Sequence, residues 1–250
     1  MTNNHPSSIT LHPSSPVVLY EDNHIIIVSK AVGEIVQGDK TGDTPLSETI
    51  KLFLKEKYQK PGNVFLGVVH RLDRPVSGVC LFAKTSKALP RLNALFADHK
   101  KVSKVYLAIV GKRPPTEQGE LVNWLTRNEK TNTARAYDRE VPGSKKSILR
   151  YQVVGQSDRY WLLRIELETG RHHQIRCQLA KMGCPIRGDL KYGAPRSNPD
   201  GGISLHAYEL TLEHPVSHET IHVTAPLPKE RIWQAFGISA TPLHEEPNQP

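Results

Sequence analysis

Short apolar runs separated by Gly, Pro and polar residues predict a chain made mainly of strands. The runs that we interpret as strands lie at residues 17–20, 24–30, 64–69, 79–83, 105–110, 147–154, 159–167, 204–212 and 220–224. The first two enclose a polar turn and are predicted to form a hairpin. Strands outnumber helices, and the short links favour antiparallel neighbours.

Four segments have apolar residues at helical spacing instead. Pro45 opens the first, the second spans 86–98 with Ser86 as its cap, the third opens at 169–174 and ends at Gly183, and the last lies near 229–236. Residues 111–146 are polar and rich in turn formers, so we interpret them as a surface excursion that could form a hairpin.

The length and charge of the chain narrow the class of protein. At 250 residues it can bury one large core or two small ones. We predict one catalytic domain over 16–238, between polar tails at 1–15 and 239–250 that are expected to be disordered. The net charge of +8 favours a polyanionic partner, with nucleic acid ahead of acidic lipid.

The cysteines and the apolar runs bear on the compartment. Cys80, Cys177 and Cys184 form no C-x-x-C pair and sit among apolar neighbours, so buried thiols in a reducing compartment are expected. The N-terminal residues lack the layout of a signal peptide, and no apolar run approaches the length of a membrane span. We therefore predict a soluble, cytoplasmic monomer without a membrane partner.

One acidic residue stands between two of the apolar runs. Asp73 lies between Arg71 and Arg74, in a segment closed by Pro75 and Gly78. Nearby positive charge favours the ionised form of a carboxylate, which suits nucleophilic attack or charge stabilisation better than proton donation. The alternative is an ordinary turn aspartate paired with a neighbouring arginine, and the spacing leaves both interpretations open.

A second polar segment, residues 170–176, could bind an anion. Arg171 and Arg176 flank residues 172–174 at a predicted helix start, where free N–H groups and guanidinium groups attract anions. The anion could be a phosphate or the Asp73 carboxylate. A solvated basic turn is the alternative.

Other candidate features are weaker. Tyr106 lies in an apolar strand, either as a core residue or as a ring on which a base stacks. Lys104 belongs to a basic cluster that could be solvated or could meet phosphate. His172 and His173 are adjacent and so should not both face one metal from a helix. No ligand set completes a metal site, and the common nucleotide-binding glycine loops are absent.

Taken together, these segments resemble the RluA-type pseudouridine synthases over residues 17–233. Residues 70–78 with 83–84 are similar to the motif H-R-L-D-x-x-T-S-G-x-x-x-x-A-K, residues 104–108 to K-x-Y-x-A, residues 170–176 to G-R-[TS]-H-Q-[IL]-R, residues 185–193 to P-I-x-G-D…Y-G, and residues 205–207 to L-H-A. Residues 20–22 and 28–30 resemble the opening segment.

The resemblance implies an α+β fold with a mixed, mostly antiparallel central sheet, flanking helices and a basic cleft. It also implies isomerisation of uridine in ribosomal or transfer RNA without metal or organic cofactor. Asp73 would be the essential carboxylate, Tyr106 would stack on the uracil and help to remove the C5 proton, and Arg171 would pair with Asp73. Arg71 would fill the gap left by the flipped base. The remaining expected contacts to substrate or RNA are His70, Leu72, Arg74, Lys104, Ile175 and Arg176.

Three positions depart from the family pattern, and two other functions compete. Ala31, Val76 and His172 stand where the family has Pro, Thr, and Thr or Ser. No S4-like RNA-binding module is expected before the catalytic part. The chief alternative is a catalytically inactive RNA-binding or assembly factor with the same fold. A glycosidase-like enzyme would need a second carboxylate near Asp73, for which the candidates are Glu21, Asp22 and Asp189.

Overall fold

The computed structural model describes residues 15–98 and 101–237. Except for residue 15, the predicted tails at 1–15 and 239–250 lie outside the described residues. The strands are β1 (Val17–Glu21), β2 (Ile25–Lys30), β3 (Gly67–Val68), β4 (Ser77–Ala83), β5 (Val102–Val110), β6 (Gln118–Asn128), β7 (Thr133–Tyr137), β8 (Lys145–Gln156), β9 (Trp161–Leu167), β10 (Leu205–Glu213) and β11 (Thr220–Thr224). The helices are α1 (Leu46–Lys57), α2 (Ala88–Ala97), α3 (Gln174–Lys181), the 3-10 turn η1 (Leu190–Tyr192) and α4 (Arg231–Gln234).

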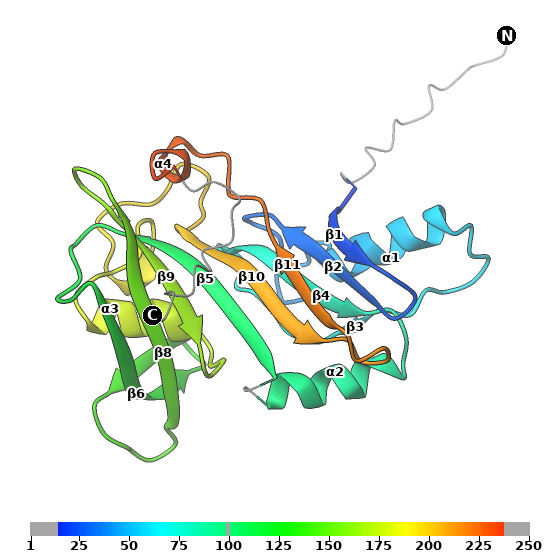
Figure 1. Cartoon of the computed structure of the whole chain (residues 1–250), viewed down its shortest axis with the longest axis horizontal. Helices are drawn as coiled ribbons and strands as arrows, with labels where there is room; N and C mark the ends of the chain where they lie inside the picture. Colours follow the sequence, from blue (N-terminus) through cyan, green and yellow to red (C-terminus); the bar gives the residue numbers. More distant parts are fainter. Residues whose placement is uncertain (1–14, 99–100, 238–250) are drawn as a thin grey trace, which may run out of the picture.

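All of these strands belong to one mixed sheet. Its order is β1-β2-β4-β10-β5-β9-β8-β6-β7, with β11 beside β10 and β3 beside β4. The pairs are antiparallel except for β4 with β10, which run parallel. In Figure 1 the strands β5 and β10 join two halves, one with β1 to β4, α1 and α2, the other with β6 to β9 and α3. The predicted α+β fold with a mostly antiparallel sheet is confirmed.

The central strands are buried on both faces, which explains their unbroken apolar sequence. In β2, Ile26 and Val28 pack into the core cluster that includes α1 and α3, while Ile25 and Ile27 pack into the cluster that includes α2. Strand β4 alternates in the same way. Strands covered on both faces lose the alternation of apolar and polar residues that marks a half-exposed strand. This core holds the start of β4, and therefore the preceding Asp73 segment, in place.

Three predicted elements differ from the observed ones. The apolar run 64–69 contributes only β3, which pairs with Phe82 and Ala83, because the next N–H of β4, that of Leu81, donates to the His70 side chain. Helix α2 is capped by Thr85, whose Oγ1 accepts the Ala88 N–H, and not by Ser86. Residues 111–146 do form a hairpin, but β6 and β7 extend the central sheet.

Two further expectations concern membrane-spanning helices and the thiols. None of the helices in residues 15–98 and 101–237 is long and apolar enough to cross a membrane. All three cysteines are free and buried, which confirms the predicted burial of the thiols.

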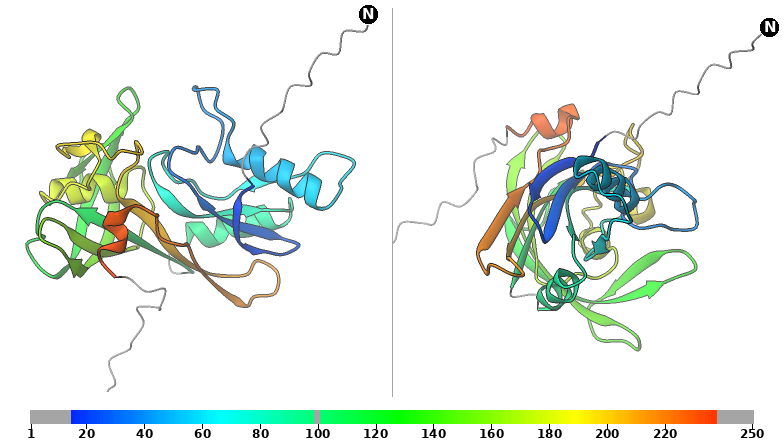
Figure 2. Two further views of the ribbon diagram at one scale, coloured as in Figure 1. Left: turned by 90° about the horizontal axis from the view of Figure 1, so that it is seen from above. Right: turned by 90° about the vertical axis from the view of Figure 1, so that its right-hand side faces the viewer.

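The green segments between residues 118 and 146 reach beyond the rest of the sheet in Figure 2.

Candidate active site

The Asp73 segment is held by its own turn and by a close approach to β10. The Val76 N–H donates to the Asp73 carbonyl at 3.0 Å, closing a turn before β4. Gly78 follows with φ of 113°, and a Cβ atom there would lie 2.1 Å from the carbonyl oxygen of Ala207 in β10. Only glycine fits this backbone conformation and this contact. The turn that carries Asp73 is therefore fixed in position relative to β10.

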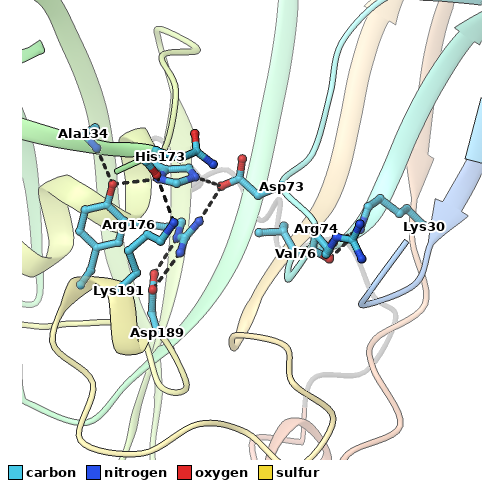
Figure 3. Close-up of polar contacts among 11 residues, drawn as sticks. Lys30, Asp73, Arg74, Val76, Ala134, His173, Arg176, Asp189 and Lys191 are labelled. Carbon is cyan, nitrogen blue, oxygen red and sulfur yellow. Dashed lines mark hydrogen bonds and ion pairs between the residues drawn. The ribbon is translucent and has the colours of Figure 1, made fainter. Parts of the chain in front are cut away.

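Lys30, the last residue of β2, anchors the same segment. Its side chain is buried at 1% exposure, and Nζ donates to the carbonyls of Ala31, Arg74 and Val76 at 2.9, 3.2 and 2.6 Å. Burial lowers the pKa of Lys30 to about 8, although the charges of Cys80, Glu34 and Asp73 partly oppose this. Two of the three carbonyls, those of Arg74 and Val76, belong to the turn that begins at Asp73, so Lys30 fixes the backbone that carries the carboxylate. Figure 3 shows Lys30 on one side of this turn and the partners of Asp73 on the other.

Arg176 is the ion-pair partner of Asp73. Its Nη1 lies 3.0 Å from Asp73 Oδ2, while Nε and Nη2 donate to Asp189 Oδ2 and Oδ1 at 2.6 and 2.9 Å. Burial alone would lower the pKa of Arg176, but Asp189 and Asp73 outweigh it and raise that pKa. One buried guanidinium thus joins two carboxylates, and bidentate pairing fixes its plane.

The predicted pairing of Arg171 with Asp73 is wrong. Arg171 is exposed in the turn before α3, and in the described part of the chain no ion pair joins it to Asp73. Its charge instead helps to lower the pKa of Lys104, after burial. The helix starts only at Gln174, so Arg171 stands outside it while Arg176 lies in its first turn, facing the core.

His173 is a second partner of Asp73, and sequence reasoning did not assign it a role. Its Nε2 lies 3.3 Å from Asp73 Oδ2, and its Nδ1 lies 2.9 Å from the hydroxyl of Tyr192. Burial first, then Arg176 and other cations, lower the pKa of His173 to about 2, so the ring is neutral. Asp189, Tyr192 and Lys30 were also missed, although each belongs to a motif segment. Oδ1 of Asp73 makes no hydrogen bond or ion pair within residues 15–98 and 101–237.

Tyr106 and the RNA-binding candidates of β5 lie around this centre. Tyr106 is half-buried in β5, and burial, Asp73 and Cys80 raise its pKa, so its phenol is neutral. Lys104 is half-buried in the same strand, with its ammonium group 5.9 Å from the centre of the Phe96 ring. Arg71 is exposed beside the site and close enough to lower the pKa of His172. Their contacts to RNA stay predictions.

The other predicted contact residues are engaged with the protein. His70 Nε2 accepts the Leu81 N–H at 3.0 Å, and burial lowers the pKa of His70 to about 4. Leu72 and Ile175 are buried in the core cluster, at 8% and 4% exposure. Arg74 points away from Asp73 and pairs with Asp43 at 2.7 Å. A role for these residues toward RNA stays a prediction.

Asp73 and two histidines have ligand atoms within 4.8 Å of one another, a spacing that could suit a metal ion. The expectation that His172 and His173 cannot both face one metal from a helix does not apply, because both precede α3 and His173 adopts a left-handed backbone. Their rings stack at 3.8 Å between centroids. Four cationic side chains lie close enough to act on these histidines, and they oppose a dication: Arg71, Arg127, Arg176 and Lys191.

The carboxylates that a glycosidase would need are already paired. Asp189 is held by Arg176, Glu21 by Lys84 at 2.6 Å, and Asp22 lies 2.8 Å from His214. A general acid must be free to give up a proton. Asp73 differs from these three because its Oδ1 has no partner among the described residues, and it lies among positive charge and a neutral phenol.

Comparisons with known proteins identify the family of the chain. Residues 24–181 match the family described as RNA pseudouridylate synthase. The chain is 30% identical to tRNA pseudouridine synthase C of Yersinia pestis, over 92% of this chain and 94% of that protein. It is 32% identical to ribosomal large subunit pseudouridine synthase C of Vibrio cholerae, over 84% of this chain and 65% of that one.

The fold is similar to that of a solved human structure. That structure is Human RNA Pseudouridylate Synthase Domain Containing 4, with a TM-score of 0.71, 22% identity, and coverage of 85% of this chain and 89% of that chain. The likeness concerns the fold. The chain belongs to the RNA pseudouridine synthase family, of the RluA type, and is an isomerase of that class.

Proposed function

We propose that this protein converts uridine to pseudouridine in transfer RNA, with Asp73 as the attacking carboxylate. In this reaction the bond from N1 to C1′ breaks, a bond from C5 to C1′ forms, C5 loses its proton and N1 gains one. The observation that carries the proposal is the geometry of Asp73. Oδ2 is held by Arg176, and Oδ1 is left to face the nucleotide.

The surrounding residues support roles in this reaction. A uracil must leave its helix to reach Asp73, and we assign the half-buried ring of Tyr106 the role of stacking on it. Arg71 and Arg127 lie near enough to the site to act on His172, and such cations attract the phosphate backbone. A structure with bound RNA would test the basic cleft that the resemblance predicts.

Transfer RNA is favoured over ribosomal RNA by the extent of the match. The relative named for transfer RNA aligns along 94% of its length, while the large-subunit relative aligns along 65%. The sequence of residues 70–78, which contains Arg74-Pro75, also favours transfer RNA. The monomeric and cytoplasmic states remain predictions, which gel filtration and cell fractionation test.

Tritium release from RNA labelled at uracil C5 tests the activity. Wild-type protein should release tritium from transfer RNA, and Asp73→Asn should release none above background, because an amide is a poor nucleophile. Equal release from both proteins would remove Asp73 from the mechanism. Large-subunit RNA fragments serve as the competing substrate, and release from these alone would overturn the choice of transfer RNA.

A further inference from the structure

A series of hydrogen-bonding groups leads from the backbone of β7 to Asp73. The Ala134 N–H donates to the hydroxyl oxygen of Tyr192 at 2.7 Å, and that hydroxyl lies 2.9 Å from His173 Nδ1. Within residues 15–98 and 101–237 no other acceptor for the Tyr192 hydroxyl proton exists, which favours donation from the hydroxyl to Nδ1. A neutral imidazole carries one proton. That proton is then on Nε2, the atom facing Asp73.

The backbone of His173 is strained in a way that serves this contact. His173 has φ of 51° and ψ of 26°, a left-handed conformation that is unfavourable for a non-glycine residue. The residue is buried at 7% exposure, directly before α3. Strain of this kind persists where the surrounding structure enforces it, and it often marks functional positions. Here it turns the imidazole toward Asp73 and away from the helix.

Two side-chain nitrogens approach one oxygen of Asp73. Arg176 Nη1 lies 3.0 Å from Oδ2, and His173 Nε2 lies 3.3 Å from the same atom (Figure 3). A carboxylate held by one donor can still turn about its bond to Cβ, whereas a second donor from another direction resists that rotation. The longer contact is of the kind that tightens when substrate binds.

We propose that Tyr192 and His173 form a positioning relay, in which Tyr192 sets the tautomer of His173 and His173 orients the Asp73 carboxylate. Oδ1 is thereby aimed at the nucleotide. The proposal rests on the proposed function, since its benefit is to catalysis by Asp73. His173 and Tyr192 are positioning residues that act through Asp73.

A pair of substitutions at His173 separates the hydrogen bond from the backbone strain. The amide nitrogen of Gln can occupy the place of Nε2, whereas Asn reaches only the place of Nδ1. We expect kcat to fall by about 100-fold in His173→Asn and by about tenfold or less in His173→Gln, with KM nearly unchanged. Asn tolerates the left-handed conformation better than Gln, so backbone preference alone gives the opposite order. Activity of His173→Asn equal to or above that of His173→Gln would overturn the relay.

Removal of the Tyr192 hydroxyl tests the first step of the relay. Tyr192→Phe keeps the ring beside Arg176 but leaves His173 Nδ1 without its donor. We expect a kcat about tenfold lower, with a mixture of His173 tautomers in ¹⁵N NMR spectra in place of the Nε2–H form of the wild type. Tyr137→Phe on β7 is the matched control, since its hydroxyl bonds to no other residue in the described ranges, and it should match wild type.

The spectra and the kinetics distinguish the two proposals. A wild-type His173 that carries its proton on Nδ1 would overturn the relay even if the enzyme is active. Absence of tritium release by the wild type would refute the proposed function, while the tautomer of His173 would still be read directly. Unchanged kcat in Tyr192→Phe, with an altered tautomer, would show that the relay does not assist Asp73.

Discussion

The two sides of the Asp73 segment use arginine in opposite ways. On the outer side Arg74, adjacent to Asp73 in sequence, has a side chain 39% exposed and pairs with Asp43 and Asp39 at 2.7 and 3.7 Å. On the inner side Arg176, 103 residues away in sequence, has a side chain 6% exposed and holds Asp73 and Asp189. Arg74 lies in the turn that Asp73 opens, and its side chain leaves that turn toward Asp43 and not toward the carboxylate.

Burial makes the ion pairs of Arg74 and Arg176 contribute differently to stability. An exposed pair is screened by water and salt, and its contribution to stability is small. A buried guanidinium that bridges two carboxylates cannot be removed without leaving unpaired charge in the interior. Lys30 belongs to the buried class as well, although it holds carbonyls of the segment and not its carboxylate. The comparison predicts that loss of buried cations is severe and loss of Arg74 mild.

The largest effect is expected from Arg176→Met. Removal of one partner from a buried ion pair costs about 3–5 kcal/mol, so the free energy of unfolding in urea should fall by that amount. Tritium release should be lost as well. Arg164→Met on β9 is the matched control, since Arg164 is 11% exposed and pairs with Glu166 and Glu209 away from Asp73. It should lower stability while kcat stays near that of the wild type, and equal loss of kcat in both variants would contradict the assigned role of Arg176.

Lys30→Met gives an intermediate effect with a distinctive pH dependence. The pKa of Lys30 is lowered from 10.5 to about 8, so between these values the unfolded chain binds more protons than the folded one. Stability therefore rises with pH across this window, by up to about 3 kcal/mol for a shift of this size. Urea unfolding of wild type and Lys30→Met should show an advantage of the wild type that is larger at pH 10 than at pH 7. If the advantage of the wild type shrank with rising pH, folding would not lower the pKa of Lys30.

The smallest effect is expected from Arg74→Ala. The variant should unfold at nearly the same urea concentration as wild type, and any difference should vanish at high salt because the pairs with Asp39 and Asp43 are exposed. Its kcat should be unchanged, since Arg74 does not touch the carboxylate. A loss of kcat comparable to that of Arg176→Met would erase the contrast between the two sides.

Much of the site could be predicted from local sequence. Asp73 was identified by its position between apolar runs and by the resemblance of residues 70–78 to a family motif. Tyr106 followed from its strand and motif in the same way. These predictions depend on a residue and its close neighbours, and strands buried on both faces leave a clear apolar signature.

The partner of Asp73 was predicted wrongly for a physical reason. The helix was expected to open at 169–174, which put Arg171 at its start, but the left-handed His173 delays the start to Gln174. One signal was present in the sequence. Arg176 lies three residues before Leu179, on the same side of the helix, and a charged residue on an apolar face has to be paired.

By itself, the sequence determined that the chain folds as strands around Asp73, that it carries excess positive charge, and to which family it belongs. Only the tertiary structure decided which arginine meets Asp73, that Lys30 holds its turn, and that Tyr192 and His173 complete the site. Apolar periodicity and motifs are local properties of the chain. Ion pairs and hydrogen bonds between residues 73, 176 and 189 depend on where α3 and η1 pack against the sheet, and that packing is a property of the whole fold.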